Sequence, residues 1–246
     1  MLRASTTLPR STCSQNGCVD EAASGVLAEL RFYADVMPRT SPVMAFESLL
    51  SGNERFVAGA PEHPNQDAAR RRELAPGQDP FAVVLGCSDS RLAAEIIFDQ
   101  GLGDLFVVRT AGHVVGAEVL GSVEYATSVL GARLVVVLGH DSCGAVAAAR
   151  GAVEDGLSVG GFVRDVVERV TPSILAARAA GLTADHDVDE HIRHTVDLLL
   201  DRSRLLSEQV EAGKVAVVGL GYQLADGSAR LVTSRGDITA GGQAGS

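Results

Sequence analysis

Three residues whose side chains bind metals follow two buried-strand patterns in this 246-residue chain. Cys87 comes just after the apolar run 81–85, and His140 and Cys143 come just after the apolar run 134–138. Because parallel strands end at the same edge of a sheet, we expect these two thiols and one imidazole to meet there. They would supply three of the four ligands of a tetrahedral zinc site and leave the fourth position for water. Such an open site can carry out chemistry.

A carboxylate and a guanidinium follow the first cysteine closely, since Asp89 and Arg91 lie two and four positions after Cys87. Two thiolates would largely cancel the charge of zinc, so neighbouring residues would have to help its water ionise. A carboxylate this close tends to take the open metal position, whereas a bidentate pairing with arginine would hold it away and orient it towards the water. The alternative is that Asp89 only caps a helix that begins near Leu92. We favour the role beside the metal because Cys87 is so near.

Four short apolar runs predict buried strands, and the segments between them have helical periodicity. The strands are predicted at 81–86, 105–109, 134–139 and 215–220. Helices are predicted from Ser41 onwards and over 118–130, 145–153 and 189–210. Strands that alternate with helices indicate an α/β fold with a parallel sheet and right-handed crossovers. Sites in such sheets form beyond the carboxyl ends of the strands, where Cys87, Arg109 and His140 all fall.

Composition and charge exclude several classes of protein. The net charge of −10 argues against nucleic acid or an anionic membrane as a partner. No apolar run reaches the ~18 residues that a membrane helix needs, so we expect a soluble protein. Four cysteines in a chain of this length do not form a disulfide scaffold. As metal ligands, Cys87 and Cys143 indicate a reducing compartment, and we predict the cytoplasm. Cys13 and Cys18 have the wrong spacing for a zinc knuckle.

The two ends of the chain differ from its middle. Residues 1–36 are rich in serine and threonine and lack the apolar stretch of a secretory signal. We expect a disordered tail or a start codon placed too far upstream, with Met37 and Met44 as alternative starts; an organelle-targeting segment is the other interpretation. A single catalytic domain is predicted over 37–238, followed by a flexible tail at 239–246.

Two motifs together carry a family resemblance. Cys-Ser-Asp-Ser-Arg at 87–91, followed by Gly-His-Asp-Ser-Cys-Gly at 139–144, resembles the β-class carbonic anhydrases, and the bacterial members most of all. The resemblance covers roughly residues 41–235. Three further stretches strengthen it: Phe-Asp-Gln-Gly at 98–101, Phe-Val-Val-Arg at 106–109 and Gly-Ser-Val-Glu-Tyr-Ala at 121–126.

The resemblance implies a set of site residues and a reaction. One Zn²⁺ per subunit would be held by Cys87, His140 and Cys143, with Asp89 and Arg91 as the catalytic dyad beside it. Zinc-bound hydroxide would attack carbon dioxide and give bicarbonate and a proton. The implied substrate pocket, which reaches the metal partly across a dimer interface, consists of Gln78, Phe106, Tyr125 and Gly144.

The resemblance also implies an architecture and an assembly. The fold would be a single α/β domain with a mostly parallel four-stranded central sheet flanked by helices. An N-terminal helical arm would pack on a dimer partner, and the helical segment from Ser41 fits that arm. The protein would be a homodimer or a dimer of dimers, that is, a homotetramer.

Some members of the resembled family have a closed state. In it the aspartate, here Asp89, leaves the arginine and becomes the fourth zinc ligand, at lower pH or when bicarbonate binds a second site. That second site uses a tryptophan where this chain has Val84, although Gly86 and Tyr222 match other parts of it. We therefore expect closure at low pH to persist and the response to bicarbonate to be weak.

Three other histidines have competing interpretations. His113 lies four residues after Arg109, near the predicted edge of the site, and could relay protons from metal-bound water. An ordinary loop histidine is the favoured interpretation. His191 and His194 could share a metal on one helix face, but their charged neighbours favour an exposed polar face.

Two rival functions remain open on the sequence. A hydrolase of carbon disulfide or carbonyl sulfide with the same fold would keep the zinc site and alter the pocket. A non-catalytic zinc protein that senses bicarbonate or pH would use the closed state alone. A zinc-dependent dehydrogenase is disfavoured, because Gly219-Leu220-Gly221-Tyr222 lacks the remaining glycine of a dinucleotide fingerprint.

Overall fold

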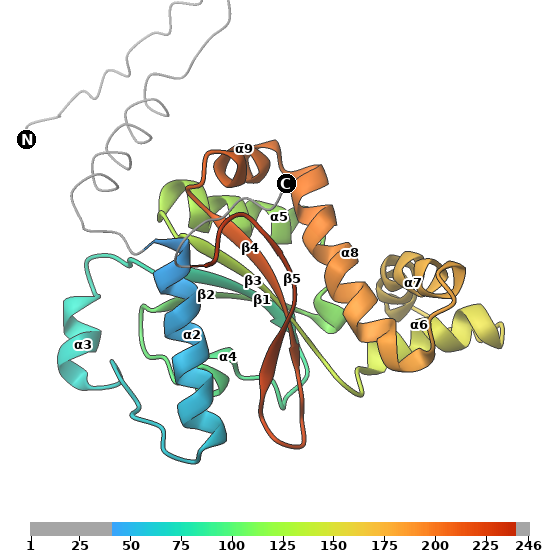
Figure 1. Cartoon of the computed structure of the whole chain (residues 1–246), viewed down its shortest axis with the longest axis horizontal. Helices are drawn as coiled ribbons and strands as arrows, with labels where there is room; N and C mark the ends of the chain where they lie inside the picture. The colour runs from blue at the N-terminus through green and yellow to red at the C-terminus, as the bar shows by residue number, and fades with distance from the viewer. Residues whose placement is uncertain (1–40, 240–246) are drawn as a thin grey trace, which may run out of the picture. The chain divides into compact units, whose positions relative to one another are not determined.

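The computed structural model describes residues 41–239, which form an α/β fold around a central sheet (Figure 1). The sheet has five strands in the order β2-β1-β3-β4-β5. Their bounds are β1 Ala82–Cys87, β2 Leu105–Thr110, β3 Leu134–His140, β4 Ala216–Tyr222 and β5 Ala229–Arg235. The predicted tails at 1–36 and 239–246 lie outside the described residues apart from residue 239.

The first four strands run parallel, as predicted, and the fifth corrects the prediction of a four-stranded sheet. β5 pairs antiparallel with β4 at one edge. Its sequence, Ala-Arg-Leu-Val-Thr-Ser-Arg, has no continuous apolar run, and its side chains are partly or fully exposed. An edge strand of this kind lacks the hydrophobic signal by which the buried strands are recognised.

Every residue of β1, β3 and β4 is buried, because helices cover both faces of the sheet. Alternate strand residues belong to two separate hydrophobic clusters. Val84, Val136 and Val218 pack in the cluster that includes α2 (Pro42–Val57), α4 (Ala94–Ile97), α6 (Gly144–Glu154) and α7 (Val163–Ala179). Their neighbours on the strands pack in the cluster that includes α5 (Ala117–Glu124), α8 (Asp187–Arg202) and α9 (Arg204–Glu211).

Two predicted helices are divided in the structure. The range 118–130 contains α5 followed by the π-helical turn η2 (Tyr125–Val129). The range 189–210 contains α8 and α9, which are separated at Ser203 because that residue has extended backbone angles. The Ser203 hydroxyl accepts a hydrogen bond from the Leu206 amide and thereby caps the second helix. The helix α7 and the turns η1 (Ala111–His113) and η3 (Ala184–His186) correspond to no predicted range. The arginine run 70–72, which is typical of a solvated helix face, lies in the short helix α3 (Ala68–Glu73), which has no buried residue.

Helix α2 begins one residue after Ser41, whose side chain accepts a hydrogen bond from the Met44 amide. Its buried face packs on the core of its own chain, with α4 beside it in Figure 1. The expected contact of this helix with a dimer partner would have to use its exposed side and stays a prediction. Among residues 41–239, no helix is both long and apolar enough to cross a membrane.

Asn53 fastens α2 to two distant segments. Its amide nitrogen donates to the carbonyls of Ile97 and Gly227, at 3.1 and 2.8 Å, and its oxygen accepts from the Ala229 amide at 2.9 Å. The side chain is buried, so each of these groups would lose its partner without gaining water. Asn53 therefore joins the first described helix, the segment before β2 and the start of β5.

We expect Asn53→Ala to lower the free energy of unfolding by about 2–3 kcal/mol, because it leaves buried backbone groups without partners. The measurement is urea unfolding of the metal-loaded protein at one fixed protein concentration. Glu47→Ala is the control, since Glu47 is exposed on the same helix and its loss should cost less than about 0.5 kcal/mol. Equal stability of the two variants would contradict the role assigned to Asn53.

Candidate metal centre

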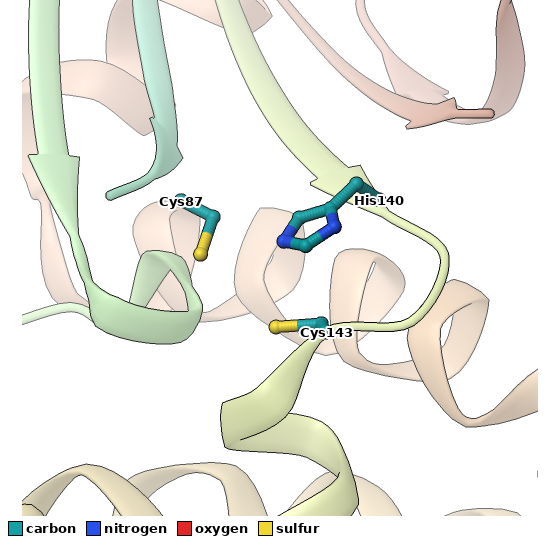
Figure 2. A group of neighbouring side chains, drawn as sticks. All are labelled: Cys87, His140 and Cys143. Atoms are coloured by element: carbon teal, nitrogen blue, oxygen red, sulfur yellow. The ribbon is translucent and has the colours of Figure 1, made fainter. Parts of the chain in front are cut away.

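Two of the three predicted metal ligands are the last residues of neighbouring strands. Cys87 ends β1 and His140 ends β3, and these two strands pair in parallel at the centre of the sheet. Both side chains therefore emerge at the carboxyl edge of the sheet, and Figure 2 shows the Cys87 sulfur and the His140 ring turned towards each other.

The third predicted ligand lies on the turn that follows β3. Asp141 and Ser142 form this turn, and Ser142 takes a left-handed backbone angle of φ 54° that reverses the chain sharply. Cys143 then occupies the N-cap position of α6. The start of a helix is positively polarised and favours a thiolate there. Its sulfur points back towards the other two ligands (Figure 2).

The three ligand atoms fit a single metal ion. They lie within 4.8 Å of one another, and all three residues are buried. In tetrahedral zinc coordination the corresponding atoms are about 3.5–3.8 Å apart, so only a small contraction is needed. The His140 Nδ1 atom lies 2.7 Å from the Asp141 carbonyl oxygen and must donate to it, which leaves a lone pair on Nε2. That buried Nε2 has no hydrogen-bond partner among the described residues, and a metal would supply one.

The donor types indicate which metal the centre suits. Two thiolates and one imidazole match zinc, and three protein ligands leave a fourth position for water or substrate. A hydrogen bond with Cys143 lowers the pKa of the Cys87 thiol to about 4, although burial opposes this shift. The same hydrogen bond raises the pKa of Cys143. The hydrogen bond thus places a proton between the two sulfurs, and metal binding would release it.

Asp89 and Arg91 form the bidentate pair that the sequence suggested. The Arg91 Nε and Nη2 atoms donate to Asp89 Oδ1 and Oδ2 at 2.9 and 2.7 Å, and the Arg91 backbone amide also donates to Oδ1 at 2.9 Å. These hydrogen bonds hold the pKa of Asp89 well below its usual range. The Asp89 Oδ2 atom lies 3.9 Å from His140 Nε2, the nitrogen that faces the ligand group. A carboxylate that is fixed and ionised therefore lies beside the metal position.

Arg109 holds the segment that carries this carboxylate. Its Nε atom donates to the Cys87 carbonyl at 3.1 Å, and its Nη2 atom donates to the Asp89 carbonyl at 2.7 Å. Sequence reasoning places Arg109 at the sheet edge without giving it a role. The contacts of Arg109 follow from the pairing of β1 with β2, in which Gly86 lies opposite Arg109. This strand register cannot be read from the sequence.

The structure brings together two of the four predicted pocket residues. The rings of Phe106 on β2 and Tyr125 on η2 have centroids 6.2 Å apart, and Tyr125 is 45% exposed. Gly144 is the exposed first residue of α6, next to Cys143. Gln78 is exposed on the loop ahead of β1, and no described contact joins it to the ligand group.

The structure corrects the interpretation of His191 as part of an exposed face, because only 2% of this residue is exposed. Its ring stacks on that of His113 with centroids 4.4 Å apart. His113 is completely buried, and neither of its ring nitrogens has a partner among the described residues. Burial lowers the pKa of His113 well below its ordinary value. A neutral ring without access to solvent does not support the proton-relay interpretation. His194 is half-buried on the next turn of α8.

Comparisons with known proteins agree with this geometry. A family model described as carbonic anhydrase matches residues 82–229. The chain is 58% identical over 203 residues to carbonic anhydrase 2 of Mycobacterium tuberculosis, which covers 82% of this chain and 98% of that protein. It is 56% identical over the same length, with the same coverage, to a carbonic anhydrase of Mycolicibacterium smegmatis.

A solved structure shows the same fold. A tetrameric β-carbonic anhydrase of Sordaria macrospora aligns with a TM-score of 0.59 over 86% of this chain and 97% of that chain, at 19% sequence identity. The family match spans most of the sheet and includes all three ligands, and the mycobacterial relatives are matched over nearly their whole length. This chain therefore belongs to the β-carbonic anhydrase family.

Proposed function

We propose that this protein is a zinc enzyme that interconverts carbon dioxide and bicarbonate. The observation that carries the proposal is the meeting of Cys87, His140 and Cys143 within 4.8 Å, with an arginine-held carboxylate 3.9 Å from the metal-facing nitrogen. Zinc, when bound, supplies Lewis-acid chemistry that makes a water molecule acidic enough to yield a nucleophile near neutral pH. The family membership of the chain supports the same reaction.

In this proposal Asp89 acts as a hydrogen-bond acceptor that Arg91 holds in place. Its pKa lies well below the usual range because of Arg91, so it stays ionised and does not store a proton at working pH. An Oδ2 atom at this distance from the ligand group can accept a hydrogen bond from the attacking water and orient its lone pair towards carbon dioxide. Arg91 keeps both carboxylate oxygens occupied and so holds them off the metal.

The pocket for carbon dioxide would have an apolar wall. Carbon dioxide is small and carries no net charge, so rings such as those of Phe106 and Tyr125 can admit it while excluding water. Tyr125 is partly exposed, and Gln78 lies on a surface loop, which leaves both side chains available to a second subunit. We place them in pockets shared across a dimer interface of a homodimer or a dimer of dimers. The tetrameric state of the Sordaria macrospora relative supports this assembly.

We also propose that the centre closes at low pH. Because the pKa of Asp89 is lowered, its carboxylate survives acidification and remains able to bind a metal. Release from Arg91 would then free Asp89 to bind a metal held by the three ligands. Val84 is completely buried in the core and has no polar group, so it cannot hold bicarbonate as an indole would. Closure should therefore follow pH with little response to bicarbonate.

The requirement for free thiols on the ligands supports a cytoplasmic location.

The first prediction concerns activity and metal content together. Purified protein loaded with zinc should contain one zinc per subunit and accelerate carbon dioxide hydration in a stopped-flow assay. Cys143→Ser should lose zinc and activity in parallel, because a hydroxyl is a far weaker ligand than a thiolate. Carbonyl sulfide and carbon disulfide serve as comparison substrates. A fully zinc-loaded protein that turns over only these, or none of the three, would overturn the proposal.

The second prediction separates the dyad from metal binding. Arg91→Ala should keep one zinc per subunit while the rate of hydration falls by about 100-fold, because Asp89 is then free to occupy the open position. X-ray absorption should show a carboxylate oxygen as the fourth ligand. Arg164→Ala removes an arginine from a comparable exposed pair, with Glu168 on α7, and should leave the rate unchanged. Wild-type turnover in Arg91→Ala would refute the role of the dyad.

The third prediction concerns pH. X-ray absorption of the wild-type zinc protein should show a water oxygen as the fourth ligand above neutral pH and a carboxylate oxygen below it. In Asp89→Asn the low-pH spectrum should no longer change, since an amide is a poor zinc ligand. Added bicarbonate at constant pH and ionic strength should leave the wild-type spectrum as it was. Strong inhibition by bicarbonate under those conditions would contradict the expectation drawn from Val84.

A further inference from the structure

A chain of hydrogen bonds joins helix α8 to one of the metal ligands. The Ser173 hydroxyl lies 2.9 Å from His191 Nδ1, and His191 Nε2 lies 2.8 Å from the Gly112 carbonyl oxygen. The Gly112 amide in turn donates to Cys87 Sγ at 3.3 Å. All four residues are buried, so water does not compete for any of these groups.

The partners fix the direction of each hydrogen bond. A carbonyl oxygen only accepts, so His191 Nε2 must carry the proton that it shares with Gly112. Its Nδ1 atom is then the acceptor, and Ser173 donates to it. Burial lowers the pKa of His191 to about 4, which keeps the ring in this neutral form at working pH. The imidazole therefore links α7 and α8, by hydrogen bonds of defined direction, to the carbonyl of the peptide that follows Gly112.

The turn at position 112 requires glycine. Gly112 has φ 62°, and a Cβ atom on it would lie 2.7 Å from the Ala145 Cβ atom, so no other residue fits. Two more hydrogen bonds hold the segment that follows: Thr110 Oγ1 donates to the Val114 carbonyl at 2.9 Å, and Arg169 Nη1 donates to the Val115 carbonyl at 2.8 Å. His191 is the side chain that binds the Gly112 carbonyl.

The ring of His191 is also fixed from one side. The His113 ring packs against it, with ring centroids 4.4 Å apart and the ring planes tilted by 34°. His113 adopts φ 42°, a left-handed angle that is uncommon for a residue with a side chain. This contact leaves the His191 ring little room to rotate away from the Gly112 carbonyl.

We propose that His191 is a positioning residue of the metal centre. It holds the carbonyl of the peptide that follows Gly112, and so restrains, through the Gly112 Cα atom, the preceding peptide whose amide donates to the sulfur of Cys87. A hydrogen bond to a thiolate withdraws electron density from it, which leaves a bound metal a stronger Lewis acid. This matters in a centre where two thiolates already cancel most of the metal charge. The inference rests on the proposed zinc site, although its test does not depend on catalysis.

The test compares His191→Asn with His191→Gln in cobalt-substituted protein. The glutamine amide nitrogen lies at the level of imidazole Nε2 and can still donate to Gly112, whereas that of asparagine lies at the level of Nδ1 and cannot. In His191→Asn the sulfur-to-cobalt charge-transfer band should move to longer wavelength, because the sulfur lone pair loses its stabilising hydrogen bond. His191→Gln should restore the wild-type band. Each variant contains cobalt in place of zinc, with binding checked by metal analysis.

Two further readouts use the zinc protein. The Gly112 amide should exchange with solvent about tenfold faster in His191→Asn than in the wild type, in line with the loss of one buried hydrogen bond. Competition with a chelator should show zinc held about 10-fold more weakly, because the Cys87 sulfur is then no longer held in its orientation towards the metal. His194→Leu, on the next turn of α8, is the control and should change none of the three readouts.

The outcomes distinguish this inference from the proposed function. A wild-type band and wild-type exchange in His191→Asn would overturn the role of His191, even if the enzyme hydrates carbon dioxide. A shifted band that His191→Gln does not restore would also overturn it, because packing rather than hydrogen bonding would then be responsible. If the zinc-loaded wild type fails to hydrate carbon dioxide, the proposed function fails, and the comparison of bands still decides the role of His191.

Discussion

The parallel pairing of β1 with β3 at the centre of the sheet is the constraint on which the candidate metal centre depends. It makes the ends of two strands, far apart in sequence, meet at one edge, and it delivers Cys87 and His140 there with their backbones already fixed. Cys143 follows on a turn that is only two residues long. Both strands are fully buried, and buried strands are among the last parts of a protein to open. The backbone that carries Cys87 and His140 is therefore held rigidly.

The sequence predicted the α/β fold and its four parallel strands, and it predicted that Cys87, His140 and Cys143 would meet at one edge of the sheet. Continuous runs of valine and leucine identify buried strands, and the residues just beyond such runs must lie at the functional edge, which is why the ligand triad could be recognised. β5 has partly exposed side chains and little periodicity, so nothing local identifies it. Ser203 interrupts a stretch whose apolar spacing continues on both sides, and the capping hydroxyl is visible only once the backbone is known.

Residues that act through the backbone escaped prediction for a different reason. Arg109 and His191 both donate to backbone carbonyl oxygens near the centre. Every residue has a backbone carbonyl, so residue types alone do not show which one a side chain binds. His191 is flanked by charged residues, which favours an exposed face, yet its side of α8 lies over the turn at Gly112. Such contacts between distant segments cannot be read from residue spacing. They require the register of the strands and the packing of α8 on them.

The Asp89–Arg91 pair lies at the boundary between the buried centre and water. The Arg91 side chain is 54% exposed, whereas that of Asp89 is 18% exposed and the three metal ligands are buried. Dissolved ions screen an exposed charge pair far more than a buried one. The ionic strength of the surroundings thus acts on the guanidinium and leaves the sulfur and nitrogen ligands untouched. The same protein thus has three candidate metal ligands that are insulated from its medium and, beside them, an ion pair that is not.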